Sequence, residues 1–455
     1  MDVLTLARFQ FAFTVGFHYL FPPLSIGLGL ILVLMEGSWL ATKNPVYHQL
    51  ARFWSRVFAL VFAIGVATGI VMEFEFGTNW AVYSRFVGDV FGSALAAEGI
   101  FAFFLESGFL ALMIFGWDRV GPKLHFFSTC MVALGAHFSA VWIIVANSWQ
   151  QTPAGFHLVE HQGALRAEIT DFWALVFNPS SMDRLIHTVC GAWQAGAWLV
   201  VSVSAWYLLK ERHLAFAKAS LKIGLLVALA SSLLQLSTGH DSAVGVSRNQ
   251  PAKLAAFEGH YNTDPAPLYL FGWVDNTGQQ VRFGVGVPKL LSYMVHGDWE
   301  KPVTGLNEFA PGDRPPVNAV FQTYHAMVAL GMGLIALAVV SVIQWARGRL
   351  FTQRWLLGLL VFSVLGPQLA NQLGWASAEI GRQPWIVQGL LRTSDAFSKV
   401  VGSEAILASL ALFSVVYALL FAVFIFLLNH KIQHGPDEAD LPPVAPFRNE
   451  PRADV

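Results

Sequence analysis

Six side chains that are able to bind iron or to carry protons lie inside long apolar runs of this sequence. An ionisable group is expensive to keep inside a membrane, so each one needs a partner, a metal or a path to water. Histidine, methionine and carboxylate side chains are ligand types for haem iron and for other metals, and carboxylates also transfer protons. The six candidates are His18, Glu98, Glu106, His187, Met327 and Glu379.

The apolar runs that hold these residues indicate an all-α integral membrane protein. The chain of 455 residues is 55% hydrophobic and only 13% charged, far on the apolar side of soluble proteins. With 28 basic against 29 acidic residues, no basic excess points to nucleic acid. Runs long enough to cross a bilayer as helices, ~20 residues each, lie near 9–40, 56–76, 94–116, 125–149, 185–209, 216–238, 319–345, 356–379 and 404–429.

The basic residues in the links predict how these nine helices are oriented. Links rich in Lys and Arg stay in the cytoplasm, and here they follow the first, third, fifth and seventh runs. The N-terminus is then outside and the C-terminus in the cytoplasm. The link after the eighth run is a mild exception, with Arg382, Arg392 and Lys399. The cytoplasmic links carry Lys43, Arg52, Arg56, Arg119, Lys123, Lys210, Arg212, Lys218, Arg347, Arg349 and Arg354.

This orientation places five of the six candidates at a similar depth, in the outer half of the membrane. Four of them come soon after the chain enters the membrane from outside, and Glu379 comes just before the chain leaves it again. Glu106 lies deeper, ~12 Å from Glu98 along the helix. That spacing suits a proton relay from the cytoplasm toward an outer site.

Taken singly, several of these residues have purely structural interpretations. A lone membrane His such as His187 is more often a hydrogen-bonded packing residue than a ligand, and Met327 alone is typical of a gap filler between helices. Glu379 alone could be an interfacial charge that reaches water beside Arg382. Their convergence on one depth is what favours a common site.

The segments between and after the runs complete the predicted organisation. Helices 1–6 occupy residues 1–238, an outer loop 239–318, helices 7–9 residues 319–429, and a polar cytoplasmic tail 430–455. The length of the outer loop suggests a function beyond connection. Cys130 and Cys190 lie on different runs and no CxxCH motif occurs, so any haem is held noncovalently.

Several strings make the chain resemble subunit I of the cytochrome bd-type quinol oxidases, from the first run to the last. GWASAEIGRQPW, residues 374–385, is the most specific of them, and KLAAFE, residues 253–258, is similar to the quinol-loop motif of the family. The others are RFQFAFTVGFHYLFPPL around His18, GVATGIVMEFEFGTNW after the second run, and AAEGIFAFFLES around Glu98 and Glu106.

The resemblance implies three noncovalent haems. His187 and Met327 would be the axial pair of a low-spin haem b, a six-coordinate iron suited to electron transfer. His18 and Glu379 would ligate a high-spin haem b and the oxygen-reducing haem d, and which ligand serves which haem stays open. The oxygen site takes either haem d or a third haem b.

The resemblance also assigns roles outside the iron ligands. Glu98 would lie beside the oxygen-binding iron and Glu106 would deliver protons, with the path extended by Ser107 and Ser139. Lys253 would contact the quinol together with Glu258, whose carboxylate accepts a proton. Residues expected to pack against haems or to pair their propionates are Arg8, Trp375, Arg382 and Trp385.

The implied activity is that of an aerobic respiratory terminal oxidase in the inner membrane of a bacterium. Ubiquinol or menaquinol would be oxidised at the outer face, and oxygen would be reduced to water with protons from the cytoplasm, so that charge is separated without a pump. A second membrane subunit, and a small single-span subunit, are implied partners.

Some residues depart from the family pattern. His325 stands where many relatives have an Arg, two residues before Met327, and the outer loop is short, as in the branch that includes cyanide-insensitive oxidases. TGHDSA around Asp241 also differs from the acidic-Gly pattern expected in other relatives. Two other functions remain in competition: a transporter that couples solute to protons through Glu98 and Glu106, and a haem-b electron-transfer anchor without oxygen chemistry.

Overall fold

The computed structural model describes residues 2–161, 163–437 and 440. Within those residues, nine helical stretches are long and apolar enough to cross a membrane, which confirms the predicted fold class. Six stretches are single helices, namely α3 (Pro45–Thr78), α7 (Pro122–Gln151), α9 (Ser181–Leu209), α10 (Leu214–Asn249), α13 (Val317–Ala346) and α17 (Ser403–His434). The other three are interrupted, and they consist of α1 (Val3–His18) with α2 (Pro22–Thr42), α5 (Gly88–Glu98) with α6 (Phe104–Phe115), and α14 (Arg354–Phe362) with α15 (Leu365–Ile380).

Two of the three interruptions have a local cause that is visible in the sequence. Pro22 and Pro23 open α2, and proline has no N–H for the helix that precedes it, so α1 ends at His18. Pro367 has the same effect on the turn between α14 and α15. Between α5 and α6 the helix widens into a π-turn, Gly99–Phe103, a feature common at functional sites. The break after α1 lies next to His18, and the π-turn lies between Glu98 and Glu106.

The bundle packs most densely around α9, which contacts α10, α2, α14 and α15. Its crossing with α2 depends on two glycines. A Cβ on Gly27 would lie 2.3 Å from the carbonyl oxygen of Ala192, and one on Gly196 would lie 2.3 Å from the backbone of Gly27. Small residues allow membrane helices to approach this closely, so these two positions set the distance between the helices.

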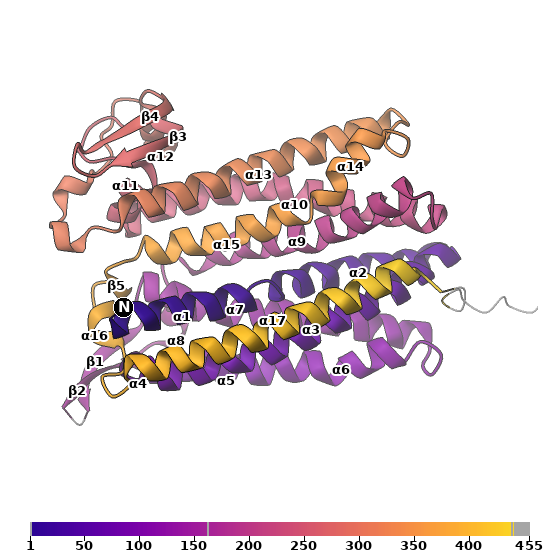
Figure 1. Cartoon of the computed structure of the whole chain (residues 1–455), viewed down its shortest axis with the longest axis horizontal. Helices are drawn as coiled ribbons and strands as arrows, with labels where there is room; N and C mark the ends of the chain where they lie inside the picture. Colours follow the sequence, from indigo (N-terminus) through magenta and orange to yellow (C-terminus); the bar gives the residue numbers. More distant parts are fainter. Residues whose placement is uncertain (1, 162, 438–439, 441–455) are drawn as a thin grey trace, which may run out of the picture.

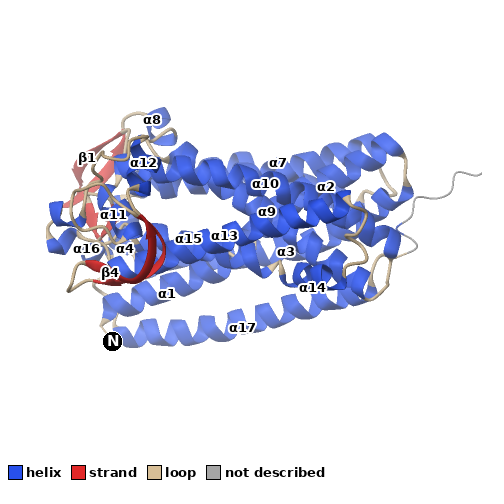
Figure 2. Cartoon of the chain, turned by 90° about the horizontal axis from the view of Figure 1, so that it is seen from above, coloured by secondary structure: helices blue, strands red, loops and turns tan. Residues whose placement is uncertain are grey.

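The short elements gather at one end of the bundle, together with the N-terminus (Figures 1 and 2). Among the described residues, three two-stranded antiparallel sheets lie there. Their strands are β1 (Phe156–His161) with β2 (Ala164–Ile169), β3 (Leu268–Asp275) with β4 (Gln280–Val287), and β5 (Trp385–Val387) with β6 (Leu391–Arg392). The short helices are α4 (Ala81–Phe86), α8 (Phe172–Val176), α11 (Pro251–Glu258), α12 (Leu290–His296) and α16 (Thr393–Ala396).

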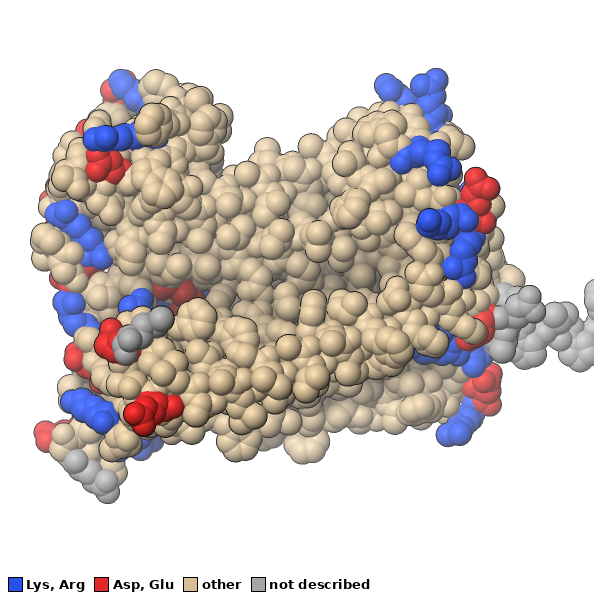
Figure 3. Space-filling model, viewed as in Figure 1, with Lys and Arg blue, Asp and Glu red and all other residues tan. Residues whose placement is uncertain are grey.

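Charged side chains lie at both ends of the bundle, with an uncharged belt between them (Figure 3). The end opposite the N-terminus carries the basic links, as the distribution of Lys and Arg predicts. Such a belt is what the hydrocarbon core of a bilayer requires. The bundle therefore spans from an end with folded loops to an end with short basic links.

The long loop begins later than the sequence predicts. Helix α10 continues through residues 239–249, so the connection covers 250–316. It contains α11, the β3–β4 hairpin, α12 and two 3₁₀ turns, Leu306–Glu308 and Pro311–Asp313. Its apolar side chains, among them Leu254 and Phe257, form a cluster with Phe321 of α13. The loop is thus a small folded unit packed on α13.

Candidate functional site

Glu379, near the end of α15, lies in a polar cluster that reaches across to α7. One of its carboxylate oxygens accepts hydrogen bonds from the side-chain amides of Asn147 at 3.0 Å and Gln151 at 3.2 Å. The other oxygen pairs with the guanidinium of Arg382. Arg382 also donates to Gln150 at 2.8 Å. The carboxylate is therefore oriented by fixed donors, and it does not reach toward bulk water as an interfacial charge would.

Arg184, at the start of α9, adds a second guanidinium to this cluster. It donates to the side-chain oxygen of Asn147. Its Nε is buried and has no hydrogen-bond partner within the described part of the chain. A buried cationic donor of this kind fits an anionic group such as a haem propionate.

His18, at the end of α1, is oriented by Thr68. The Thr68 hydroxyl lies 2.9 Å from Nδ1 of His18 and 3.0 Å from the carbonyl oxygens of both Ile64 and Gly65. When the hydroxyl hydrogen points to either carbonyl, Thr68 accepts from Nδ1 and the lone pair is on Nε2. Metal-binding histidines are commonly oriented by such a bond on the other ring nitrogen, so His18 fits a haem-ligand role.

His187 and Met327 lie in two different helix interfaces. On α9, His187 contacts the Thr238 hydroxyl at 3.1 Å and the Gln235 amide nitrogen, which is 2.8 Å from its Nε2. On α13, the sulfur of Met327 would be 2.8 Å from a Cβ on Gly374 of α15. Ligation through Nε2 of His187 requires the Gln235 amide to turn away, and the axial pairing with Met327 stays a prediction.

Glu98 and Glu106 flank the π-turn, and both face α7. Glu98 accepts a hydrogen bond from Ser139 at 2.8 Å. Glu106 is buried, and a Cβ on Gly135 would lie 2.9 Å from its Cβ. Ser107 instead donates to the Phe103 carbonyl of its own helix at 2.7 Å. Of the two serines predicted to extend the proton path, only Ser139 is bonded to one of these carboxylates.

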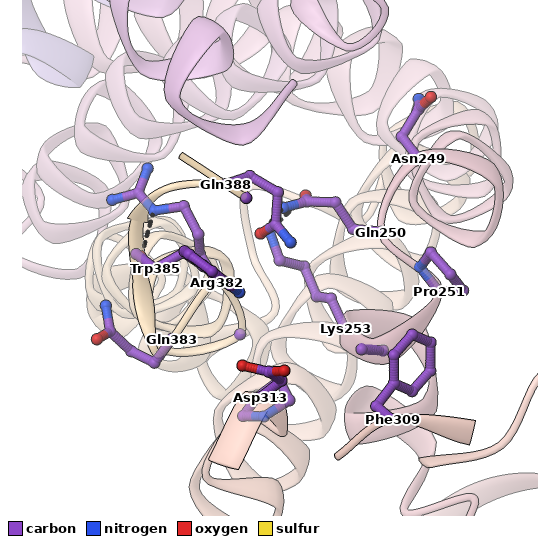
Figure 4. A pocket seen from close by; sticks show the side chains of 14 residues that line it. Asn249, Gln250, Pro251, Lys253, Phe309, Asp313, Arg382, Gln383, Trp385 and Gln388 are labelled. Atoms are coloured by element: carbon purple, nitrogen blue, oxygen red, sulfur yellow. Dashed lines mark hydrogen bonds between the residues drawn. The ribbon is translucent and has the colours of Figure 1, made fainter. Parts of the chain in front are cut away.

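Lys253 lines a cavity of about 230 Å³ at the same end of the bundle (Figure 4). Lys253 is only 2% exposed, and its Nζ contacts the side-chain oxygens of Gln151 and Gln250. Burial, and then the nearby Arg184 and Arg382, hold the pKa of Lys253 well below its usual range. The amine can therefore lose its proton far more easily than an ordinary lysine.

The wall opposite Lys253 is formed by the segment that follows Glu379. Arg382, Gln383, Trp385 and Gln388 line the cavity there. Figure 4 shows Gln388 and Gln250 meeting across it, and their side chains are 3.1 Å apart. The volume is somewhat below the ~300–1,000 Å³ usual for drug-sized ligands, so the cavity suits a single ring more than a long tail.

Glu258 does not share this cavity with Lys253. It is buried between α11, β3 and α13, where its Oε2 lies 3.8 Å from Nε2 of His325 and makes no hydrogen bond within the described residues. Burial raises the pKa of Glu258 to about 8. His325 has a carbonyl oxygen, which only accepts hydrogen bonds, at each ring nitrogen: Phe321 lies 2.9 Å from Nδ1 and Tyr269 2.9 Å from Nε2.

The remaining predicted cofactor contacts divide into two groups. Arg8 is exposed on α1, outside the cluster around Glu379. Trp375 lies half-buried on α15. Trp385 lines the cavity and stacks under the guanidinium of Arg392, 4.6 Å from its ring centre. Only Arg382 and Trp385 belong to the cluster and its cavity.

Sequence reasoning missed the amides that organise this site. Asn147, Gln150 and Gln151 come from the string ANSWQQTP, a polar run that ends an apolar helix, and this was the signal available. It also missed the buried pair Glu36 and His125, which meets the same criterion of ionisable residues inside a span. No three His, Cys, Asp or Glu side chains in the described part form a metal-holding group.

The fold and these buried groups define a multi-pass helical membrane protein with carboxylates and histidines inside its spans. The sequence profile described as "Cytochrome bd terminal oxidase subunit I" matches residues 6–436. The chain belongs to this family, which implies haem cofactors and a second subunit.

Relatives and a solved structure agree with this assignment. The chain is 39% identical to a cytochrome bd ubiquinol oxidase subunit 1 of Bacillus subtilis (strain 168), over 96% of this chain and 95% of the relative. It is 34% identical to a cytochrome bd-II ubiquinol oxidase subunit 1 of Escherichia coli (strain K12), over 96% and 97%. It resembles the bd oxidase structure from Geobacillus thermodenitrificans with a TM-score of 0.88 at 28% identity, covering 96% of this chain and 99% of that one.

Proposed function

We propose that the chain is the haem-carrying subunit of a terminal quinol:oxygen oxidoreductase. It oxidises ubiquinol or menaquinol at the outer face and supplies protons from the cytoplasm for the reduction of oxygen to water. Two quinols and one oxygen give two quinones and two waters, and the separate sides of proton release and uptake generate a proton motive force without pumping. The observation that carries the proposal is the cavity between Lys253 and the segment that follows Glu379.

The cavity offers the chemistry that quinol oxidation needs. Quinol oxidation releases two electrons and two hydroxyl protons. Lys253, with its lowered pKa, is a buried amine able to take up a hydroxyl proton. Gln250 and Gln388 supply amide groups for the head-group oxygens. Glu258 lies behind α11 and serves as a second acceptor for protons on their way out.

The iron sites lie beside this cavity in the proposal. Haem supplies one-electron transfer and, at an open iron, oxygen chemistry. His187 and Met327 would hold a low-spin haem b, while His18 and Glu379 would hold a high-spin haem b and haem d, or a third haem b. The cluster around Glu379 supports this, since Arg184 and Arg382 provide cationic donors for propionates.

Protons reach the oxygen site through the helix pair α6–α7. Glu106 is buried against Gly135, and Glu98 is bonded to Ser139 one turn further along α7. Both carboxylates therefore follow the same helix face. Glu106 holds a proton in transit and Glu98 delivers it.

The oxidase complex includes a second membrane subunit and a small single-span subunit in the bacterial inner membrane. The outer face is the end that carries the folded loops, because the opposite end holds the basic links. The loop of residues 250–316 is then the quinol loop, in its short form.

Replacing Lys253 tests the quinol site. Lys253→Met keeps the length of the side chain and removes the amine, so we expect a KM for quinol about tenfold higher, equivalent to about 1.4 kcal/mol, with unchanged haem spectra. Steady-state oxygen uptake by the purified complex measures it. Lys289→Met, in an exposed ion pair of the same loop, is the control and should behave as wild type. Equal KM values for both variants would contradict the proposal that quinol binds in this cavity.

A further inference from the structure

A buried acid and histidine lie in the half of the bundle away from the candidate iron ligands. Glu36 on α2 is 1% exposed and His125 on α7 is 2% exposed. Oε1 of Glu36 lies 2.7 Å from Nδ1 of His125, and Oε2 accepts a hydrogen bond from Thr129 at 2.6 Å. Nε2 of His125 lies 3.1 Å from the carbonyl oxygen of Met113 on α6. No role assigned above uses this group.

The geometry fixes the number of protons that the pair holds. Nε2 faces a carbonyl oxygen, which only accepts, so Nε2 carries a hydrogen. Nδ1 and Oε1 are both acceptors until one proton lies between them. With that proton the pair is neutral overall, as a buried site favours, and without it a negative charge is buried. The pair is therefore a store for one exchangeable proton.

His125 of this pair lies on α7, the helix that Glu98 and Glu106 both face, and it is nearer to the basic end of the bundle. On α7, His125 and Thr129 are followed by Gly135, which touches Glu106, and by Ser139, which is bonded to Glu98. On α6, Met113 follows Glu106 by seven residues, ~10 Å along the helix. A gap of that size is one that a short chain of water molecules can bridge.

On its other side the pair is linked to the basic end of the bundle. The ring of Trp117 lies 3.8 Å from that of His125 and 5.1 Å from that of His48 on α3. Nδ1 of His48 contacts the Asp440 carbonyl oxygen at 2.7 Å. Arg52 pairs with both Asp118 and Asp440 there. Besides His125, the titratable groups near Glu36 are thus His48 from α3 and Cys130 from α7, and Asp118 from the link lies near His48.

We propose that Glu36 and His125 form the proton-loading site that supplies Glu106 from the cytoplasmic end. The shared proton leaves toward Glu106 through water, and the pair regains one proton from the side of His48, so that each cycle passes one proton and restores the neutral pair. The inference rests on the proposed function, because it presumes that Glu106 passes protons to the oxygen site.

The test is the rate of proton uptake that accompanies oxygen reduction by the reduced, intact oxidase complex. Glu36→Gln keeps an oxygen to accept from Thr129 but cannot exchange a proton, and we expect uptake at least tenfold slower. Glu36→Asp retains the acid and should recover to within about threefold of wild type. Ser220→Ala, which removes a buried hydrogen bond to Trp54, is the packing control and should leave the rate unchanged. If Glu36→Gln does not assemble, His125→Gln carries the same expectation.

The outcomes separate the two proposals when Glu106→Gln is measured in parallel. Slow uptake in Glu106→Gln with a normal rate in Glu36→Gln overturns only the loading site, and protons then enter elsewhere. Equally slow Gln and Asp variants at position 36, with full haem content, would mark a structural role and also overturn it. Normal uptake in Glu106→Gln contradicts the proposed function itself, and the loading site with it.

Discussion

Glu379 obtains two of its three side-chain partners from residues more than two hundred positions away in the chain. Asn147 and Gln151 of α7 bind one carboxylate oxygen and Arg382 the other. From the sequence alone, Glu379 could also be interpreted as an interfacial charge that reaches water beside Arg382. The pairing with Arg382 is local, three residues apart, and could be predicted. The amides come from a distant helix, and a contact between two distant helices cannot be predicted from residue spacing within either of them.

The structure predicts a specific loss when Glu379 is removed. Glu379→Ala leaves Arg382 and the α7 amides without their carboxylate and takes away the proposed ligand. We expect one high-spin haem signal to disappear or to change its spectrum, while the low-spin signal is retained. Quantitative haem analysis and low-temperature spectra of the complex measure it. Glu404→Ala, an exposed carboxylate at the start of α17, is the matched control; retention of every haem signal in Glu379→Ala would refute the ligand assignment.

The raised pKa of Glu258 predicts that the rate of quinol oxidation depends on pH. Its pKa is raised by burial from 4.5 to about 8, so the group is mostly protonated at pH 7. A proton acceptor must be ionised, and the ionised fraction rises about tenfold per pH unit below the pKa. Quinol oxidation should therefore accelerate as pH rises toward 8. The folded state also binds this proton more tightly than the unfolded state, so the stability that the group contributes is lost as pH rises through 8.

The check is a pH profile of oxygen uptake under quinol saturation. Glu258→Gln should flatten the rise below pH 8 and lower the maximal rate. Glu300→Gln, an exposed residue of the same loop, should keep the wild-type profile. A rise that persists unchanged in Glu258→Gln would assign the titration to another group.

At the scale of elements, apolar length predicted each membrane helix, but the interruptions were not predicted. The breaks at Pro22 and Pro367 follow from proline chemistry visible in the sequence. The π-turn between Glu98 and Glu106 carries no such signal, because GIFAF is compatible with an ordinary helix. The extension of α10 through residues 239–249 was also missed, since that stretch is polar and the helix is stabilised by packing against α11 and α12.

The α2–α9 crossing yields a prediction about stability. Gly196→Ala places a Cβ 2.3 Å from the backbone of Gly27, and backbone cannot rotate aside as a side chain can. The helices must separate, which should cost roughly 1–3 kcal/mol or more and lower the thermal unfolding midpoint of the complex. Gly331→Ala on α13, where a Cβ meets nothing within 4 Å, should leave the midpoint unchanged. Equal midpoints would show that this crossing has room to relax.

For the whole molecule, charge and hydropathy were sufficient to divide the bundle into two ends. The two-stranded sheets and short helices gather at one end with the N-terminus (Figure 1), and charged side chains lie at both ends (Figure 3). What could not be predicted is which candidates share a cavity. Lys253 and Glu258 belong to one motif of six residues, yet only Lys253 reaches the cavity, because the two side chains leave α11 in different directions. The two serines predicted for the proton path also differ: Ser139 donates to Glu98, whereas Ser107 donates to a carbonyl of its own helix.

The central claim is that this chain carries the haems of an oxygen-reducing quinol oxidase. The most direct measurement is the reduced-minus-oxidised spectrum of the purified complex, with and without carbon monoxide. We predict a low-spin haem b signal that carbon monoxide leaves unchanged, together with a high-spin signal that it shifts, at the wavelength of haem d or of haem b. A complex without haem absorbance would contradict the central claim and favour a transporter. A purely low-spin spectrum that carbon monoxide leaves unchanged would also contradict it, and would indicate an electron-transfer anchor without oxygen chemistry.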